Sequence, residues 1–257
     1  MILKVKNIFD KINEFAPYNL QSDYDNSGIM VGDRDMVTNG ILVTLDTTLP
    51  VLIQAKEFGC NVVVEHHPII WGGLKTIDPQ LPNNDAICYA IKNDIAIISA
   101  HTNFDFAENG LNDFVAKKME LNSITKQNFD SPRIGVLNKI TTLKEYAKKL
   151  SNIFGDKNVL TVGNLDKPIQ KVAVINGGGG SDADIIMDTY RAGCDVYVSG
   201  EIKHNVGRLA KELNYAIIQI NHQNCELDFI PLMEEKLKEK INTINVLSTT
   251  MLTNPFN

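Results

Sequence analysis

The sequence has no pair of closely spaced cysteines and no long apolar run. Its four cysteines are far apart and form no CxxC pair. No stretch approaches the roughly 18 consecutive apolar residues of a membrane-spanning helix. The first fifteen residues are amphipathic and charged, unlike the apolar core of a signal peptide. We therefore expect a reduced, cytoplasmic protein with no membrane partner, whose thiols are mostly buried as small apolar groups.

An excess of positive charge is also missing. The formal net charge is −6, which disfavours a surface that binds nucleic acid or anionic lipid, although a local basic groove is compatible with it. At 257 residues with 44% hydrophobic residues, the chain is long enough to bury a large core as one large or two modest domains.

Two stretches of the sequence show the same pattern of segments. Each contains an apolar run, a helical segment, a Gly-Cys pair, a valine-rich run, a second helical segment and a third apolar run. The three apolar runs are residues 41–45, 62–64 and 95–98 in the first stretch, and 172–175, 196–198 and 216–218 in the second. Continuous branched-aliphatic runs separated by helices are typical of parallel strands buried on both faces.

This repeated pattern predicts an α/β fold. We expect two similar, internally duplicated halves, 1–125 and 126–257, with mixed, largely parallel sheets covered by helices. Chance similarity between two common βα units is the alternative explanation. A charged helix at 142–154, a C-terminal helix at 227–240 and a closing strand at 244–247 complete the expected elements.

All five histidines lie just beyond the expected strand ends. They are His66, His67, His101, His204 and His222. Ligand sites in sheets with parallel strands form outside the carboxyl ends of those strands. The histidines therefore predict a site at these ends.

The pair His66-His67 directly follows a strand and precedes Pro68. Adjacent residues of a strand point to opposite faces, so both imidazoles serve one site only if the strand ends or bends there, as Pro68 favours. The alternative is that one histidine caps the strand and the other is solvated.

Two later histidines are each followed by a carboxylate four residues on, in the pairs His101/Asp105 and His222/Glu226. On a helical turn this spacing places both groups on one face. Glu226 as a helix N-terminal charge is the alternative. Imidazole and carboxylate ligands without thiolate suit Zn, Mn, Fe or Co. We expect Cys225 to be a buried helical thiol, and a place in the lining of the pocket is the alternative. Donors from both stretches would form a two-metal site able to activate a bridging water.

Two further segments contribute candidates. Glu201 and His204 follow the strand at 196–198 and offer an acid and a base. The loop Gly177–Gly180 precedes a helix and could present N–H groups to an anion. It lacks the Lys-Ser/Thr of a P-loop, so a tight strand-to-helix turn is an equally good interpretation.

The order of these motifs resembles the family called GTP cyclohydrolase 1 type 2, or Nif-three-like. The resemblance runs nearly end to end, so it implies a single domain over residues 1–257 that contains the two approximate halves. It is carried by Asp23–Gly32, Glu65–Pro68, His101–Asp105, Gly110–Asp113, Asn176–Gly180, Ser199–His204 and His222–Glu226. Roughly 60 residues connect the two halves, too few for the inserted domain of some members, so the chain resembles the short form.

The resemblance implies two divalent metal ions per chain, held between the halves, and a homohexameric ring. It implies His66, His67, Asp105, His222 and Glu226 as the metal ligands. His101 and His204 match positions near the metals, and with Glu201 we assign them to proton transfer.

The family name implies opening of the guanine ring of GTP, with attack of metal-activated water at C8 and release of formate. The first hypothesis is therefore a metal-dependent hydrolase acting on a nucleotide or another small molecule. The alternative is a non-catalytic metal-binding or regulatory ring protein with a protein or nucleic-acid partner. A metal-insertion role is compatible with the same residues.

Overall fold

The computed structural model describes residues 2–128, 130–251 and 254–255, and the chain divides into two compact units. Unit 1 comprises Met1–Glu108 and Asp228–Asn257, and unit 2 comprises Asn109–Leu227. This division differs from the expected halves because the C-terminal strand β11 (Asn245–Ser248) pairs in parallel with β2 (Gly40–Asp46) of the first sheet. Within the described ranges, none of the helices has the length and apolar character needed to cross a membrane.

Unit 1 is built on a five-stranded sheet in the order β1-β4-β3-β2-β11. The remaining strands are β1 (Gly28–Val31), β3 (Val62–His67) and β4 (Ala96–Ser99). The helices are α1 (Val5–Phe15), η1 (Tyr18–Leu20), α2 (Leu49–Glu57), α3 (Asn84–Lys92), α4 (Thr102–Phe106) and α10 (Phe229–Lys240). Only β1 runs antiparallel to its neighbour among the described pairings of this sheet.

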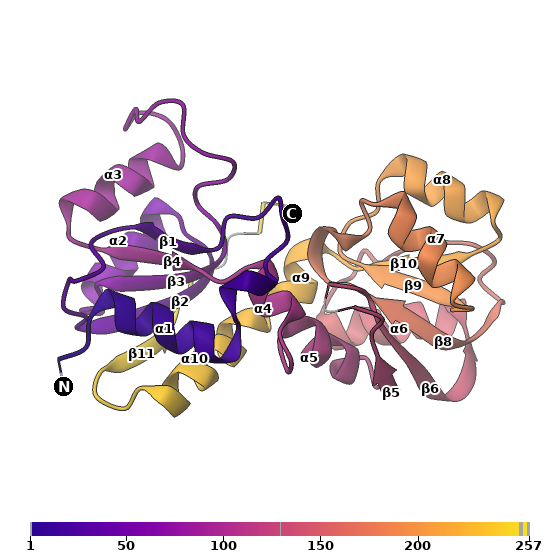
Figure 1. The fold of residues 1–257 in the computed structure, drawn as a ribbon. Coiled ribbons are helices and arrows are strands. Elements are labelled where there is room, and N and C mark those ends of the chain that lie inside the picture. Colours follow the sequence, from indigo (N-terminus) through magenta and orange to yellow (C-terminus); the bar gives the residue numbers. More distant parts are fainter. Residues whose placement is uncertain (1, 129, 252–253, 256–257) are drawn as a thin grey trace. The chain divides into compact units, whose positions relative to one another are not determined.

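The branched-aliphatic runs form central strands because both faces of this sheet are covered. Leu42, Val63 and Ile97 lie in one buried cluster with apolar residues of α2 and α3. Helices α1 and α10 lie on the opposite face (Figure 1). Each fully buried side chain of this kind contributes about 1.5–3 kcal/mol of transfer free energy, so the continuous runs predicted these strands well.

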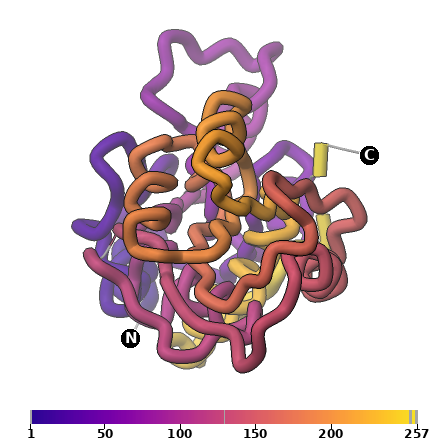
Figure 2. The backbone as a smooth tube through the Cα atoms, turned by 90° about the vertical axis from the view of Figure 1, so that its right-hand side faces the viewer, coloured from indigo at the N-terminus to yellow at the C-terminus, as the bar shows by residue number. Residues whose placement is uncertain are grey.

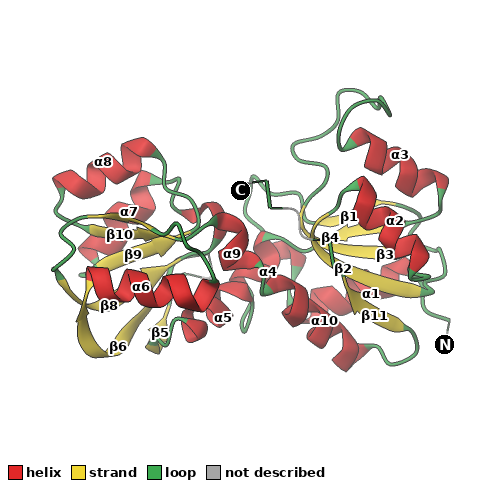
Figure 3. Ribbon diagram, turned by 180° about the vertical axis from the view of Figure 1, so that it is seen from behind, coloured by secondary structure: helices red, strands yellow, loops and turns green. Residues whose placement is uncertain are grey.

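Unit 2 contains a six-stranded sheet in the order β5-β6-β8-β9-β10-β7. Its strands are β5 (Asn122–Thr125), β6 (Arg133–Thr142), β7 (Leu160–Val162), β8 (Pro168–Val174), β9 (Val196–Ser199) and β10 (Ala216–Gln219). Its helices are α5 (Leu111–Lys118), α6 (Leu143–Phe154), η2 (Gly177–Gly179), α7 (Ala183–Arg191), α8 (His204–Glu212) and α9 (His222–Glu226). Figure 3 shows helices over the strands of each unit.

The two units repeat the same strand and helix arrangement. In unit 1 the parallel neighbours β2, β3 and β4 alternate with α2 and α3. In unit 2 the parallel neighbours β8, β9 and β10 alternate with α7 and α8. The predicted α/β class with two helix-covered sheets is confirmed, and in each unit the parallel strands end at a common edge, where the histidine-bearing segments begin.

A long connection follows the histidine pair in unit 1. Residues 68–83 join β3 to α3 without a helix or strand. Figures 1 and 2 both show this segment extending away from the sheet beyond α3. Connections of this length in compact domains are uncommon and often functional.

Candidate metal centre

The carboxyl end of β3 delivers two histidines. The strand ends at His67 before Pro68, as predicted, and the imidazole rings of His66 and His67 have centroids 5.0 Å apart. His66 is fully buried, with Nδ1 3.1 Å from the Ala100 carbonyl oxygen. That contact assigns the ring proton to Nδ1 and leaves Nε2 as the donor atom for a cation.

A third imidazole joins this pair. His101 follows β4 at the start of α4, and its ring centroid lies 5.0 Å from that of His66 and 5.7 Å from that of His67. One ring nitrogen from each of the three lies within 4.8 Å of the others. Three converging imidazoles are sufficient to hold one divalent cation with an open coordination position.

Two aspartates orient these imidazoles, and the sequence interpretation assigned a role to neither of them. Asp46 Oδ1 lies 2.8 Å from Nδ1 of His67, and Asp25 Oδ1 lies 2.9 Å from Nδ1 of His101. Carboxylate contacts of this kind fix the tautomer and raise the basicity of the other nitrogen. Asp46 ends β2 opposite His67, so its strand-end position could have revealed it. Asp25 lies in an irregular segment with no periodic signal.

The Asp25 carboxylate is held in its ionised form. Burial alone would raise its pKa, but hydrogen bonds from His101, the Thr102 hydroxyl and the Asn26 amide hold the pKa of Asp25 well below its usual range. The Ser27 hydroxyl also donates to it, at 3.0 Å. The ionised Asp25 carboxylate therefore fixes the orientation of the His101 ring through its contact with Nδ1.

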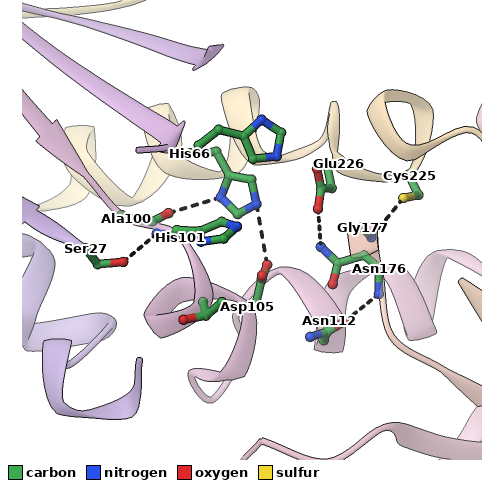
Figure 4. Close-up of polar contacts among 12 residues, drawn as sticks. Ser27, His66, Ala100, His101, Asp105, Asn112, Asn176, Gly177, Cys225 and Glu226 are labelled. Atoms are coloured by element: carbon green, nitrogen blue, oxygen red, sulfur yellow. Dashed lines mark hydrogen bonds and ion pairs between the residues drawn. The ribbon is translucent and has the colours of Figure 1, made fainter. Parts of the chain in front are cut away.

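Two further acidic groups lie beside the histidines of unit 1. Asp105, on α4, is nearly buried, and its Oδ1 lies 3.7 Å from His66 Nε2 (Figure 4). Burial raises the pKa of Glu65 to about 7. Glu65 Oε1 accepts a hydrogen bond from the Ile69 amide at 2.8 Å. This bond closes the turn around the histidine pair.

In unit 2, helix α9 presents the second histidine–carboxylate pair. His222 Nε2 lies 2.9 Å from Glu226 Oε2, in agreement with the predicted placement four residues apart. Nδ1 of His222 lies 2.9 Å from Glu201 Oε1. Glu226 is 2% exposed, and the Asn176 side-chain amide donates to its Oε1 at 3.5 Å (Figure 4).

The glycine loop closes against Glu226. Gly177 has φ +58°, and a Cβ at this position would lie 2.0 Å from Glu226 Oε1. The Gly177 amide donates to Cys225 Sγ at 3.2 Å, and the Ser181 amide donates to the Gly178 carbonyl at 3.0 Å. Because these N–H groups are used internally, the loop geometry favours the tight-turn interpretation over anion binding. Cys225 is buried, as expected.

The two remaining candidates differ in their surroundings. Glu201 is half-exposed and contacts His222, which makes it an orienting group for that imidazole. His204 is the exposed first residue of α8, and its side chain makes no hydrogen bond or ion pair with any residue that the structure describes. Its assignment to proton transfer stays a prediction.

The donor chemistry of both groups fits divalent transition metals. Unit 1 offers His66, His67, His101 and Asp105, and unit 2 offers His222 and Glu226. Imidazoles whose second nitrogen is engaged, beside nearly buried carboxylates, are the usual ligands of Zn, Mn, Fe and Co.

Several known proteins match this chain over nearly its whole length. A GTP cyclohydrolase 1 type 2 homolog of Clostridium perfringens is 33% identical over 248 residues, covering 94% of each chain. A protein of the same name from Clostridium acetobutylicum is 31% identical and covers 96% of this chain and 94% of its own. The crystal structure of Staphylococcus aureus hypothetical protein SA1388 superposes with a TM-score of 0.90 at 25% identity, covering 100% of this chain and 99% of that one. The family profile for Duf34/NIF3 (NGG1p interacting factor 3) matches residues 3–255, and the chain belongs to this family.

Proposed function

We propose that this protein is a dinuclear metal-dependent hydrolase that acts on a nucleotide or a related small molecule. In this proposal the ligands of both units serve one centre with two divalent ions. The ligands are His66, His67, Asp105, His222 and Glu226. The observation that carries the proposal is that Nδ1 of His66, His67 and His222 each lies against an oxygen atom, which orients the ring so that Nε2 is the nitrogen that would bind a cation.

The protein side chains around the centre have distinct tasks. Bound divalent ions of this type supply Lewis acidity and lower the pKa of a coordinated water. His101, held by ionised Asp25, accepts a proton at Nε2 and returns it to the leaving group. Glu201 fixes the ring of His222, and exposed His204 exchanges protons with solvent.

The names of the relatives support the reaction class. Proteins called GTP cyclohydrolase 1 type 2 homolog match this chain at 33% and 31% identity. By analogy, we propose hydrolytic opening of a nucleotide ring as the reaction, catalysed by a cytoplasmic homohexamer. The ion is one of Zn, Mn, Fe or Co.

Metal analysis tests the ligand assignment. Elemental analysis of purified protein should find about two divalent ions per chain. His67→Ala and Glu226→Ala should each lower that content sharply, because each removes one ligand. His204→Ala is the matched control, since this imidazole is exposed and makes no hydrogen bond or ion pair with the described residues, and it should keep its metal. Full metal retention in both ligand variants would refute the assignment.

Turnover distinguishes the hydrolase from the non-catalytic alternative. Metal-loaded protein is incubated with GTP and a panel of nucleotides, and products are detected by mass spectrometry. A product formed by the wild type and absent with His222→Ala supports hydrolysis. Metal-loaded protein without turnover across the panel would favour the binding or regulatory ring protein.

A further inference from the structure

Two large aromatic side chains in unit 1 are unusually exposed. Trp71 is 53% exposed and Tyr24 is 68% exposed. Their ring centroids are 6.2 Å apart, with an angle of 50° between the ring planes. Trp71 belongs to the long connection after the histidine pair, and Tyr24 precedes Asp25. Neighbouring exposed tryptophan and tyrosine side chains are characteristic of binding sites, where these two residue types are enriched.

Trp71, one member of this aromatic pair, lies beside the candidate metal ligands. The Trp71 ring lies 5.6 Å from the His101 ring, at an interplanar angle of 78°. His101 in turn lies 5.0 Å from His66. A planar molecule stacked on Trp71 would therefore place its edge next to the imidazoles.

The backbone just before Trp71 is held by two hydrogen bonds. The Asn26 side-chain amide donates to the Ile70 carbonyl at 2.8 Å, and the Ile69 amide donates to buried Glu65 at 2.8 Å. After Trp71 the chain turns away through Gly72 and Gly73, which both have positive φ. The indole is thus attached to a fixed frame, which lowers the entropy that a ligand must overcome.

We propose that Trp71 and Tyr24 form an aromatic platform that binds the planar heteroaromatic ring of a substrate and aligns its edge with the metal centre. The inference rests on the proposed function and names the residues that would bind the ring of the substrate at that site. A heteroaromatic ring matches both features of the platform: its face stacks on indole and phenol, and its polar edge meets the hydrogen-bonding imidazoles. An aliphatic ligand would use only the first feature.

Trp71 is the only tryptophan of the sequence, so it reports on its own surroundings. In the full-length protein its fluorescence should be readily quenched by acrylamide. Addition of adenosine, guanosine or their monophosphates should change its emission, whereas ribose 5-phosphate should not. Emission already shielded from acrylamide in the ligand-free protein would show that a second copy of the chain covers the platform, and would overturn the proposal.

Equilibrium dialysis with labelled nucleoside monophosphates measures the energetic contribution. Trp71→Leu should weaken binding by about fivefold to hundredfold, the range expected for loss of one stacking contact. Tyr24→Leu should weaken it less, and Trp71→Phe should retain most of the affinity. Ile77→Ala, at an exposed position of the same connection, is the matched control and should bind like the wild type.

The outcomes separate this inference from the proposed function. If Trp71→Leu binds nucleotides as tightly as the wild type, the platform is refuted even if the protein carries two metals and hydrolyses another substrate. If ring binding depends on Trp71 but the protein binds no metal, the platform stands and the hydrolase proposal fails. Metal content should be the same in Trp71→Leu and wild type, which also checks that the variant is folded.

Discussion

At the scale of single residues, the contact between the glycine loop and Glu226 leaves no space at Gly177. We expect Gly177→Ala to lose about 1–2 kcal/mol of unfolding free energy from the left-handed backbone alone. It should also displace the Glu226 carboxylate, because the new Cβ would lie 2.0 Å from Oε1. Urea denaturation and metal analysis measure the two effects.

Gly178 provides the matched control for this substitution. It lies in the same loop, and a Cβ there would meet no atom within 4 Å. Gly178→Ala should therefore change stability and metal content much less. Equal effects of the two substitutions would contradict the close approach of Gly177 to Glu226.

Asp46 leads to a second prediction for a single residue. Asp46→Asn keeps the size of the side chain but removes the charge that orients His67. We expect metal affinity to fall about 10- to 100-fold, the usual effect of losing such a partner. Competition with a chelator measures it, and exposed Asp94→Asn is the charge-matched control. Unchanged affinity in Asp46→Asn would show that His67 needs no orienting carboxylate.

Residues of the metal centre could be predicted from the sequence where the interacting residues are close together in the chain. His66 with His67, and His222 with Glu226, are close in sequence, so their spacing alone indicates a shared site. Asp46 and Asp25 lie 21 and 76 residues from the histidines they orient. Pairing across that distance depends on strand register and loop path, which spacing does not encode.

At the scale of elements, the residues around Thr142 determine where helix α6 begins. The Thr142 hydroxyl accepts from the Glu145 amide, and the Glu145 carboxylate accepts from the Thr142 amide. Thr142→Ala should therefore cost about 1 kcal/mol of unfolding free energy. Lys144→Ala, exposed on the same helix, is the control, and urea denaturation compares the two.

The carboxylate half of this capping box adds a dependence on pH. Hydrogen bonds from the Thr142 amide and the Thr141 hydroxyl lower the pKa of Glu145. A lowered carboxylate pKa stabilises the fold above the unfolded-state pKa, and this contribution is lost as the pH falls through the folded-state value. The stability difference between wild type and Glu145→Gln should therefore shrink in acid. A difference that grew in acid would contradict the bonds to ionised Glu145.

Strands with continuous apolar runs were easier to predict than β5 and β6, again for a local reason. Strands β2, β3, β8 and β9 contain continuous buried runs, which the sequence shows directly. Strand β5 has a mostly exposed pattern and β6 alternates before its exposed end. Their polar positions resemble those of loops, so no continuous apolar run marks these two strands in the sequence.

At the scale of the whole molecule, the return of the C-terminus to unit 1 could not be predicted from composition or periodicity. The C-terminal helix and strand were expected, but nothing local in them specifies which sheet they complete. Buried Phe229, Met233 and Leu237 of α10 belong to unit 1, and β11 pairs with β2. The boundary expected between residues 125 and 126 therefore differs from the boundaries of the two observed units.

This connectivity predicts different behaviour for the two units when they are expressed alone. Unit 2 is one continuous segment, Asn109–Leu227, with its own sheet and a buried cluster that includes Tyr197 and Tyr215. We expect this fragment to fold and to unfold cooperatively in urea, because its sheet is complete. Circular dichroism and dispersed amide NMR signals would measure this.

The fragment 1–108 is the matched comparison. It lacks β11 and α10, so β2 becomes an open edge and the face covered by α10 loses its cover. We expect it to aggregate or to remain unfolded, and addition of a peptide covering 228–257 should restore ordered structure. A stable, monomeric 1–108 fragment would show that the C-terminal segment is dispensable for unit 1, and an unfolded 109–227 fragment would show that unit 2 requires the rest of the chain.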